Sequence, residues 1–359
     1  MTRCDVAVIG AGMAGASLAA ALAPHLSVLL IEAEDHPGYH ATGRSAAFWS
    51  ESYGGPLVQP LTTVSGAHLR DGGYLSPRGA LHIAEPDGAE ALDKLEAESR
   101  AAVTLHRLRG AELRERVPAL NPRWSEGLWE PSCADIDVAR LHGDCLAAAK
   151  RAGARLVSGQ RLEQAERRGG VWIMRTREAT FEAATIVDAA GAWAAGVAAA
   201  CRVAPLGIRP FRRTLVQLRI EPPARADLPL VIDALGRFYF KPEAGGRLWL
   251  SPHDETPCEP CDCAPEELDV AVAIDRLERA TDWRVERVER SWAGLRSFAP
   301  DRLPVYGFDP AAPGFFWFAG QGGFGIQTAP AAAKLGADLL LGRHPELDPH
   351  PYAPGRFRN

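Results

Sequence analysis

The fold is decided by the stretch Val-Ala-Val-Ile-Gly-Ala-Gly-Met-Ala-Gly at residues 6–15. Its four apolar residues predict a short strand that is buried on both faces of a parallel sheet. The glycines then follow the spacing Gly-X-Gly-X-X-Gly. Gly10 permits a tight turn, Gly12 lets a pyrophosphate approach the backbone, and Gly15 lets the next helix pack against the strand.

The residues that follow complete a βαβ unit. The alanine-rich segment 16–26 predicts a helix, whose N-terminus offers N–H groups and partial positive charge to phosphates. The apolar run 27–31 predicts a second strand, which ends at Glu32. A carboxylate at that position can accept hydrogen bonds from ribose hydroxyls. The glycine pattern alone would fit a structural turn, but with the strand, helix and Glu32 it predicts dinucleotide binding.

Two later segments favour FAD over NAD as the dinucleotide. Residues 186–193 form a strand that ends in a small-small-glycine turn, and the candidate cofactor contacts there are Ala190, Gly191 and Trp193. Residues 320–328 form a second glycine-rich loop before a helix, and the candidates there are Gly322, Gly325, Ile326 and Thr328. A helix N-terminus at this place could stabilise negative charge on a reduced flavin ring.

The composition is that of a soluble globular protein. The chain has 359 residues, is 47% hydrophobic and carries a net charge of −5, which disfavours a nucleic-acid-binding face. No stretch is apolar enough to predict a transmembrane helix, and Asp5 and the glycines argue against a signal peptide. Seven scattered cysteines fit a reducing compartment, so we expect a cytoplasmic protein.

The order of elements predicts an α/β fold with two domains. The nucleotide-type signals are separated in sequence, so the Rossmann-like FAD-binding domain is expected to be discontinuous. The second domain is expected to be α+β, with an antiparallel sheet that helps to bind the substrate. The predicted ranges are 1–50, 140–204 and 297–345 for the first domain, 51–139 and 205–296 for the second, and 346–359 for a C-terminal tail.

Two arginines are candidate substrate ligands. Arg213 precedes a predicted strand, and Arg296 lies in the run Trp-Ala-Gly-Leu-Arg-Ser-Phe at residues 292–298. Guanidinium groups bind carboxylates through two parallel hydrogen bonds. Structural arginines in ordinary ion pairs are the alternative that the residues alone leave open.

With these motifs the chain resembles the D-amino-acid oxidase and dehydrogenase family of flavoproteins, and within it the bacterial D-arginine dehydrogenases. The resemblance covers nearly the whole chain, and its most specific segments are 38–47, 75–78, 292–298 and 321–328. It implies a two-domain fold that binds FAD non-covalently, with the substrate beside the flavin ring.

The resemblance also implies roles for single residues. Arg213 and Arg296 would grip the substrate carboxylate, and Tyr53 and Tyr239 would flank the substrate, with Tyr53 on a mobile gating loop. The carbonyl of Gly323 would receive the substrate amine. Further contacts implied at the flavin are Arg44, Ser45, Ala46 and Gln327.

The chain departs from the D-arginine dehydrogenase pattern around the substrate side chain. Ala80 stands where that pattern has a glutamate that meets the substrate guanidinium, Gly236 replaces a second acidic residue, and Phe48 replaces a histidine. Desolvating a cationic side chain without an acidic partner is unfavourable. With Trp49 beside Phe48, these residues predict a roomy apolar pocket for neutral, bulky or aromatic D-amino acids.

The expected reaction is oxidative deamination of a D-amino acid by hydride transfer to the flavin, followed by imine hydrolysis to a 2-oxo acid and ammonia. The same carboxylate clamp would suit a secondary amine or imino acid such as sarcosine, or a 2-hydroxy acid. A non-catalytic binding protein on a flavoprotein fold is a different class of alternative. The electron acceptor is expected to be oxygen or a quinone.

Two further groups of residues have less specific patterns. His40 could attach a flavin covalently, although a buried, hydrogen-bonded histidine is the ordinary alternative. His253, Cys258, Cys261 and Cys263 are residue types that ligate metals, but their spacing is not a standard zinc pattern, and we expect no metal.

Overall fold

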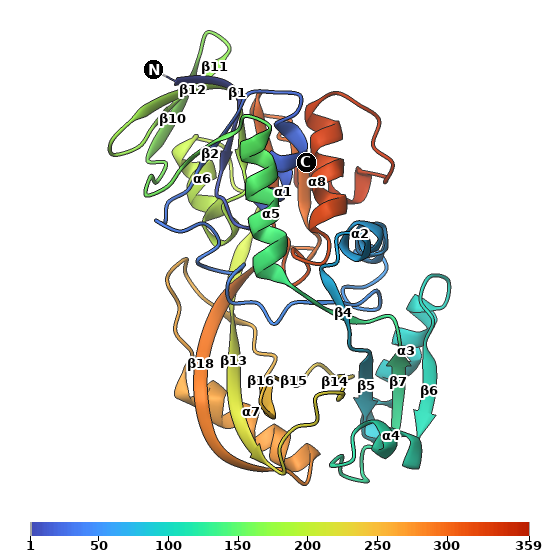
Figure 1. The fold of residues 1–359 in the computed structure, drawn as a ribbon. Helices are drawn as coiled ribbons and strands as arrows, with labels where there is room; N and C mark the ends of the chain where they lie inside the picture. The colour runs from blue at the N-terminus through green and yellow to red at the C-terminus, as the bar shows by residue number, and fades with distance from the viewer. Residues whose placement is uncertain (1, 359) are drawn as a thin grey trace.

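The computed structural model describes residues 2–358 and contains two large sheets, with a small third sheet between them (Figure 1). The chain passes repeatedly between the two large sheets. The first is built from residues 2–31, 155–188 and 305–319, and the second from residues 80–130 and 209–298. This mixed α/β architecture confirms the predicted fold class. The domain boundaries given above stay a prediction.

The first sheet has eight strands, with a parallel core. Its order is β10 (Gln164–Arg168), β11 (Val171–Arg175), β12 (Thr180–Asp188), β1 (Thr2–Ile9), β2 (Val28–Ile31) and β9 (Arg155–Val157), while β20 (Phe315–Ala319) joins β12 and β19 (Val305–Phe308) joins β20. The residues of β2 and β20 are all buried, as expected for strands covered on both faces.

Successive residues of these strands pack on opposite faces of the sheet. Val6, Val8 and Leu30 pack in the core that holds α1 (Met13–Leu22) and α8 (Ala329–Leu340). Ala7 and Ile9 pack in the core that holds α6 (Ala194–Ala200). Helix α5 (Val138–Arg151) lies beside α1 (Figure 1). The carboxyl ends of β1, β2 and β12 are therefore held at one edge, where open α/β sheets bind ligands.

The second sheet has nine strands. Its order is β17 (Thr256–Pro257), β13 (Arg209–Glu221), β16 (Arg247–Ser251), β15 (Tyr239–Glu243), β14 (Leu230–Asp233), β5 (Ala80–Ala84), β7 (Glu126–Glu130) and β6 (His106–Arg109), with β18 (Arg284–Phe298) along β13. The apolar side of α7 (Glu267–Ala280) packs on it. The long antiparallel pair β13 and β18 rises from this sheet toward the first (Figure 1).

The remaining elements are short or peripheral. The third sheet consists of β3 (Phe48–Trp49), β8 (Ala134–Ile136) and β4 (Leu75–Pro77). The other α-helices are α2 (Gln59–Asp71), α3 (Ala89–Ser99) and α4 (Ala111–Arg116). Short 3-10 turns occur at Pro86–Gly88, Gly191–Trp193, His350–Tyr352 and Pro354–Phe357.

Several predicted elements shift in position or in pairing. Helix α1 begins at Met13 rather than Ala16 and ends at Leu22 rather than Leu26, because Pro24 lacks the N–H that would continue the helix. Segment 155–157 pairs parallel with β2 at the edge of the first sheet. The strand predicted at the start of segment 186–193 is the end of a longer strand, β12.

Candidate functional site

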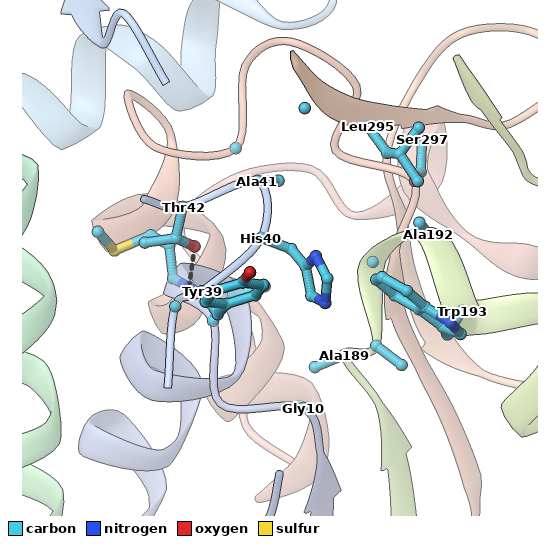
Figure 2. Close-up of a pocket in the computed structure, with 18 of the residues that line it drawn as sticks. Gly10, Tyr39, His40, Ala41, Thr42, Ala189, Ala192, Trp193, Leu295 and Ser297 are labelled. Atoms are coloured by element: carbon cyan, nitrogen blue, oxygen red, sulfur yellow. Dashed lines mark hydrogen bonds between the residues drawn. The ribbon is translucent and has the colours of Figure 1, made fainter. Parts of the chain in front are cut away.

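A cavity of about 660 Å³ extends from the carboxyl edge of the first sheet to the strands β13 and β18. We call it the central cavity. Figure 2 shows the loop 39–42 on one side of it, facing Ala189 and Trp193 across the space, with Leu295 and Ser297 beyond. The lining includes the glycine-rich turn, Glu32, and the loop that follows β20.

The glycine-rich turn leaves no room for side chains. A Cβ on Gly10, whose φ is +99°, would lie 2.6 Å from the Ala189 carbonyl oxygen. A Cβ on Gly15 would lie 1.9 Å from the Gly10 carbonyl oxygen, so only glycine lets the helix approach this closely. The first helical residue, Met13, donates its backbone N–H to Thr42 Oγ1 over 2.9 Å (Figure 2). Backbone therefore forms this part of the cavity surface, as a pyrophosphate requires.

Glu32 lies at the carboxyl end of β2 and lines the central cavity. Its Oε2 accepts a hydrogen bond from the Ala11 N–H at 2.7 Å, and its Oε1 accepts one from the Glu34 N–H at 2.9 Å. These two bonds fix the carboxylate beside the turn, and the remaining lone pairs of the oxygens can accept from ribose hydroxyls. The arrangement fits the adenosine half of a dinucleotide.

Ala190, Gly191 and Trp193, the predicted cofactor contacts of this segment, line the opposite side of the central cavity. The Trp193 ring lies 4.4 Å from the His40 ring, measured between centroids. His40 Nε2 also lies 3.0 Å from Glu34 Oε1. His40 is therefore held by both a ring contact and a hydrogen bond. These contacts are those of a structural histidine, which is the ordinary alternative to covalent flavin attachment.

Arg44 fastens the loop 39–47 to β18. Its Nη1 donates to the carbonyl oxygens of Ala293 at 3.1 Å and Cys263 at 3.2 Å. Its guanidinium carbon lies 5.0 Å from the centroid of the Tyr39 ring. Residues 44–46 all line the central cavity. Their predicted cofactor contacts are thus in reach of a bound group, although Arg44 acts largely as a brace.

The register of β13 and β18 places Arg213 and Arg296 on one face. Arg213 pairs with Gly294, and Arg296 lies two residues further along β18. Because side chains alternate between faces, the two guanidinium groups project to the same side, where both line the central cavity. Burial, and then the charge of Arg296, lower the pKa of Arg213.

Arg213 is a buried cation with one unused hydrogen-bond donor. Its Nε donates to the Asp254 carbonyl oxygen at 2.7 Å, and its Nη2 donates to Glu255 Oε1 at 3.2 Å. Its Nη1 is buried without a hydrogen-bond partner among the residues that the structure describes. A buried guanidinium donor without a partner, on a side chain that lines the central cavity, can pair with an anionic ligand. Asp254 and Glu255 were not predicted, because their only feature in the sequence is that they lie shortly after β16.

Aromatic rings surround the second arginine. Arg296 Nη1 donates to the Tyr53 hydroxyl at 2.9 Å. The Tyr53 ring lies 5.3 Å from the Phe48 ring and 5.1 Å from the Phe324 ring, and the Phe48 ring lies 6.3 Å from that of Tyr239. The two predicted tyrosines therefore stand at either side of Phe48, in one continuous aromatic cluster.

Gly323 touches the same group of side chains. A Cβ at this position would lie 2.7 Å from Arg296 Nη1 and 2.9 Å from the Tyr53 hydroxyl. The loop 321–326 can approach Arg296 closely only because Gly323 has no side chain. Its neighbours Gly322, Gly325 and Ile326 also line the central cavity, and their contact with the cofactor stays a prediction.

His253 lies behind the substrate end of the central cavity. Its ring makes an edge contact with Tyr239 at 5.6 Å, and its Nδ1 donates to the Gly236 carbonyl oxygen at 2.8 Å. Burial, and then the charges of Arg213 and Arg296, lower the pKa of His253 to about 3. His253 is therefore neutral at physiological pH and adds no charge to the site.

Residues 50–52, which lead into the loop that carries Tyr53, are held by several hydrogen bonds. The carboxylate of buried Glu130 accepts hydrogen bonds from the hydroxyls of Ser50 and Ser52 and from the Glu51 N–H. This network was not predicted, and it contrasts with the mobile gating loop expected from the resemblance.

Gln327 holds the same loop from the other side. Its Oε1 accepts from the Ser50 N–H at 3.2 Å, and its Nε2 donates to the Tyr53 carbonyl oxygen at 3.1 Å. Gln327 is buried and lies outside the residues that line the central cavity. Gln327 was predicted to line the flavin end of the pocket, whereas the structure places it behind the loop that carries Tyr53.

The residues expected to enlarge the substrate pocket lie away from the central cavity. Trp49 is buried and donates its indole N–H to the Thr62 carbonyl oxygen. Ala80 is buried in β5, and Gly236 lies in the turn after β14. The geometry therefore does not support the inference that Ala80 and Gly236 open space for a bulky side chain. Gly15 and Thr328 also lie outside the lining.

Residues 2–358 contain no group of three histidine, cysteine, aspartate or glutamate side chains that could hold a metal ion. No helix in this part of the chain has the length and apolar character needed to cross a bilayer.

Comparisons with known proteins agree on one family. A model of the DAO family, described as FAD dependent oxidoreductase, matches residues 5–339. The glycine oxidase of Pseudomonas aeruginosa is 28% identical over 97% of this chain and 98% of its own length. The crystal structure of glycine oxidase from Geobacillus kaustophilus superposes with a TM-score of 0.87 and 25% identity, over 98% of each chain.

A partial match is found to a D-amino acid dehydrogenase of Cereibacter sphaeroides, which is 29% identical over 56% of this chain and 45% of its own length. The matches over nearly the full length include glycine oxidases. The family resemblance is thus confirmed, while the finer resemblance to D-arginine dehydrogenases is not supported.

Proposed function

Because this chain belongs to the DAO family of FAD-dependent oxidoreductases, we propose that it oxidises the C–N bond of glycine or of a small N-substituted glycine such as sarcosine. Two electrons and one proton leave Cα together as a hydride to give an iminium ion, and water then hydrolyses this ion to a 2-oxo acid and ammonia, or a primary amine from an N-substituted substrate. The observation that carries the proposal is the pair Arg213 and Arg296 at one end of the central cavity, with a free guanidinium donor.

FAD supplies the two-electron acceptor when it is bound. The residues that would hold its adenosine and pyrophosphate are Gly10, Gly12 and Glu32, where backbone N–H groups and a fixed carboxylate line the central cavity. Residues 44–46 and the loop 321–326 would flank its ring end, between the dinucleotide turn and the arginine pair.

The arginine pair binds and orients the substrate carboxylate. The Nη1 donor of Arg213 needs an acceptor, and a carboxylate provides one while it offsets two neighbouring positive charges. Tyr53 fixes the orientation of Arg296 through its hydroxyl. A ligand held at two points presents its Cα in one direction, and this orientation accounts for a large part of the rate enhancement expected of such a site.

The amine would lie near Gly323, whose carbonyl oxygen could accept a hydrogen bond from it. The amine must be neutral to release a hydride from Cα, so kcat/KM should rise with pH to a plateau. His253 stays neutral over this range and would not contribute a second step. The aromatic cluster of Tyr53, Phe48 and Tyr239 would exclude water from the reacting atoms.

The size of the substrate end favours a small molecule. Tyr53 is in ring contact with both Phe48 and Phe324, and Phe48 is in contact with Tyr239, so aromatic side chains already occupy the space around Arg296. The full-length relatives named glycine oxidase support the same substrate class. Glycine and N-alkylglycines have no side chain on Cα and need no further pocket.

A D-amino acid is the second candidate. The partial match to a D-amino acid dehydrogenase supports it, and the same arginine pair would bind its carboxylate. A cationic side chain would lie in the same cavity as the positive charges of Arg213 and Arg296. D-Alanine is therefore expected to be the best D-amino acid, and D-arginine a poor one.

The test is anaerobic reduction of the bound flavin, followed by its absorbance near 450 nm, the usual flavin band. The panel contains glycine, sarcosine, D-alanine, D-leucine, D-phenylalanine, D-arginine and a 2-hydroxy acid. Rapid bleaching by glycine or sarcosine supports the proposal. Faster bleaching by D-leucine or D-phenylalanine would overturn it in favour of the second candidate. Readmission of air then distinguishes an oxidase from a dehydrogenase.

A further inference from the structure

Two of the seven cysteines are placed as a pair beside the loop 39–47, which we call the cofactor-binding loop. Cys258 Sγ lies 3.7 Å from Cys261 Sγ, on the segment that follows β17. Cys261 is exposed and Cys258 is partly buried, whereas Cys4, Cys133 and Cys201 are buried in the cores of the molecule. The pair takes no part in substrate or cofactor binding as described above.

The segment 258–263 is anchored at both ends, so the pair does not sit on a free loop. The Cys258 N–H donates to the Pro210 carbonyl oxygen at 3.2 Å, which ties one end to β13. At the other end Cys263 is buried against Ala192, Ala293 and Leu295, which belong to the wall of the central cavity or lie next to it. The two thiols are thus held within reach of each other.

The same segment braces the cofactor-binding loop. Asp262 lies between the exposed Cys261 and the buried Cys263, accepts a hydrogen bond from the Tyr39 hydroxyl at 2.9 Å, and is paired with Arg44. The carbonyl oxygen of Cys263 accepts from Arg44 Nη1 at 3.2 Å. Any movement of Cys261 is therefore transmitted to Asp262, and from there to two residues that line the central cavity, Tyr39 and Arg44.

We propose that Cys258 and Cys261 form a thiol–disulfide exchange site whose oxidation weakens FAD binding. The oxidant is a low-molecular-weight disulfide of the glutathione class. The Cys261 thiolate attacks one sulfur of this disulfide, which forms a mixed disulfide and releases one thiol. Cys258 then loses its proton and attacks the Cys261 sulfur, which closes the intramolecular disulfide and releases the second thiol. Two protein thiols are oxidised and one small disulfide is reduced to two thiols.

The exposure of the two side chains sets the order of the steps. Cys261 is exposed, so a small disulfide reaches it first. Burial, and then the hydrogen bond with Cys261, raise the pKa of Cys258 to about 11, which suits it to the second, resolving step rather than the first. Closure must bring the sulfur atoms from 3.7 Å to about 2.0 Å, and Cys261 is the freer partner to move.

The first experiment treats the purified holoenzyme with glutathione disulfide, alkylates the remaining thiols and maps the peptides by mass spectrometry. We expect a disulfide between Cys258 and Cys261 in the wild type. In Cys258→Ser the mixed disulfide should accumulate on Cys261, because nothing resolves it, and Cys145→Ser should behave as the wild type. A bridge that includes Cys263, glutathione that stays on Cys261 in the wild type, or no modification would overturn the proposal.

The second experiment measures the dissociation constant of FAD by flavin fluorescence, before and after oxidation and again after reduction. Oxidation should raise this constant several-fold in the wild type, and a dithiol should restore it. Cys261→Ser should bind FAD equally well under all three conditions. Equal affinities of the oxidised and reduced wild type would overturn the link to the cofactor. This readout does not depend on which amine is the substrate.

Discussion

At the scale of single residues, Arg296 is the side chain whose chemistry the proposal most needs. Its Nη1 bonds Tyr53, and its neighbour Arg213 has a free donor. Arg296→Lys keeps the charge but loses the planar fork that binds a carboxylate at two points. We expect kcat/KM to fall by about 100-fold, chiefly through KM, since a bidentate charge-assisted bond is lost.

The matched control for Arg296→Lys is Arg219→Lys. Arg219 lies on the partner strand β13, but it is half exposed and pairs with Glu289 away from the central cavity. Steady-state kinetics of both variants should show a loss only for Arg296→Lys. Equal kinetics for the two variants would remove Arg296 from the substrate site.

The ionisation of Asp188 should lower the free energy of unfolding as the pH rises. It is fully buried at the end of β12, its Oδ2 has no partner among residues 2–358, and burial raises its pKa from 3.8 to about 8. The folded state therefore holds a proton that the unfolded state loses above pH 3.8. The stability that this proton contributes is complete below pH 3.8 and is lost as the pH rises toward 8, by at most about 1.4 kcal/mol per pH unit.

Asp188→Asn should remove this dependence and raise the melting temperature, most clearly at pH 8. Asp309→Asn provides a control of opposite sign. The pKa of Asp309 is lowered despite its burial, because Trp317 and Arg358 hydrogen-bond its carboxylate. Its contribution is present at neutral pH and is lost as the pH falls, so the amide should destabilise the protein at pH 7. Thermal melts from pH 5 to pH 8 that show no difference between Asp188→Asn and wild type would contradict the first expectation.

At the scale of elements, the hydrogen bonds that hold residues 50–52 should fix the position of Tyr53 in the site. Glu130 accepts three hydrogen bonds from residues 50–52, and Ser132 donates a fourth. Glu130→Gln replaces one acceptor oxygen by a donor, so at least one of these bonds must be lost at a buried site. We expect kcat/KM to fall about tenfold and the melting temperature to fall by a few degrees.

Ser132→Ala is the matched control, since it removes one bond to Glu130 without touching residues 50–52. Limited proteolysis should cut near residues 50–55 faster in Glu130→Gln than in Ser132→Ala. Unchanged proteolysis together with unchanged kinetics would show that Glu130 does not hold Tyr53 in place.

The sequence predicted those elements whose own residues carry the signal. The strand Val6–Ile9 and the strand Phe315–Ala319 are continuous apolar runs, and both lie in the buried sheet. Helix α2 was missed because its sequence contains Gly66 and two adjacent threonines. Its glycine is explained only by the fold, since a Cβ there would lie 2.6 Å from the Trp49 ring.

The strand β18 was not predicted as a strand, and only its last seven residues were singled out, as a motif of the family resemblance. Its first half is rich in charge and largely exposed, so its alternation gives no apolar face to detect. Its pairing with β13 brings Arg213 and Arg296 together, and this long-range register is not readable from either strand alone. The arginine pair was therefore predicted from family resemblance, whereas Asp254, Glu255 and Glu130 needed the three-dimensional structure.

At the scale of the whole molecule, the central cavity is lined by residues from both large sheets. Its lining runs from Ile9 in β1 to Ile326 after β20 and includes Arg213 and Arg296 of the second sheet. A ligand that fills this cavity contacts both sheets, and so it should stabilise the molecule as a unit. Binding to the folded state alone contributes about 2.7 kcal/mol when free ligand exceeds its dissociation constant 100-fold.

We therefore expect the apoprotein to melt at least about 3 °C below the protein in saturating FAD, with a midpoint that rises with FAD concentration. FMN is the matched control, because it lacks the adenosine half that Glu32 is placed to bind. FMN should stabilise the protein much less than FAD, and Glu32→Ala should reduce the difference between the two ligands. Differential scanning calorimetry of the apoprotein with each ligand measures this directly. Equal stabilisation by FMN and FAD would mean that the turn around Gly10 and Glu32 contributes little to binding, and that the ring end of the cavity alone connects the two sheets.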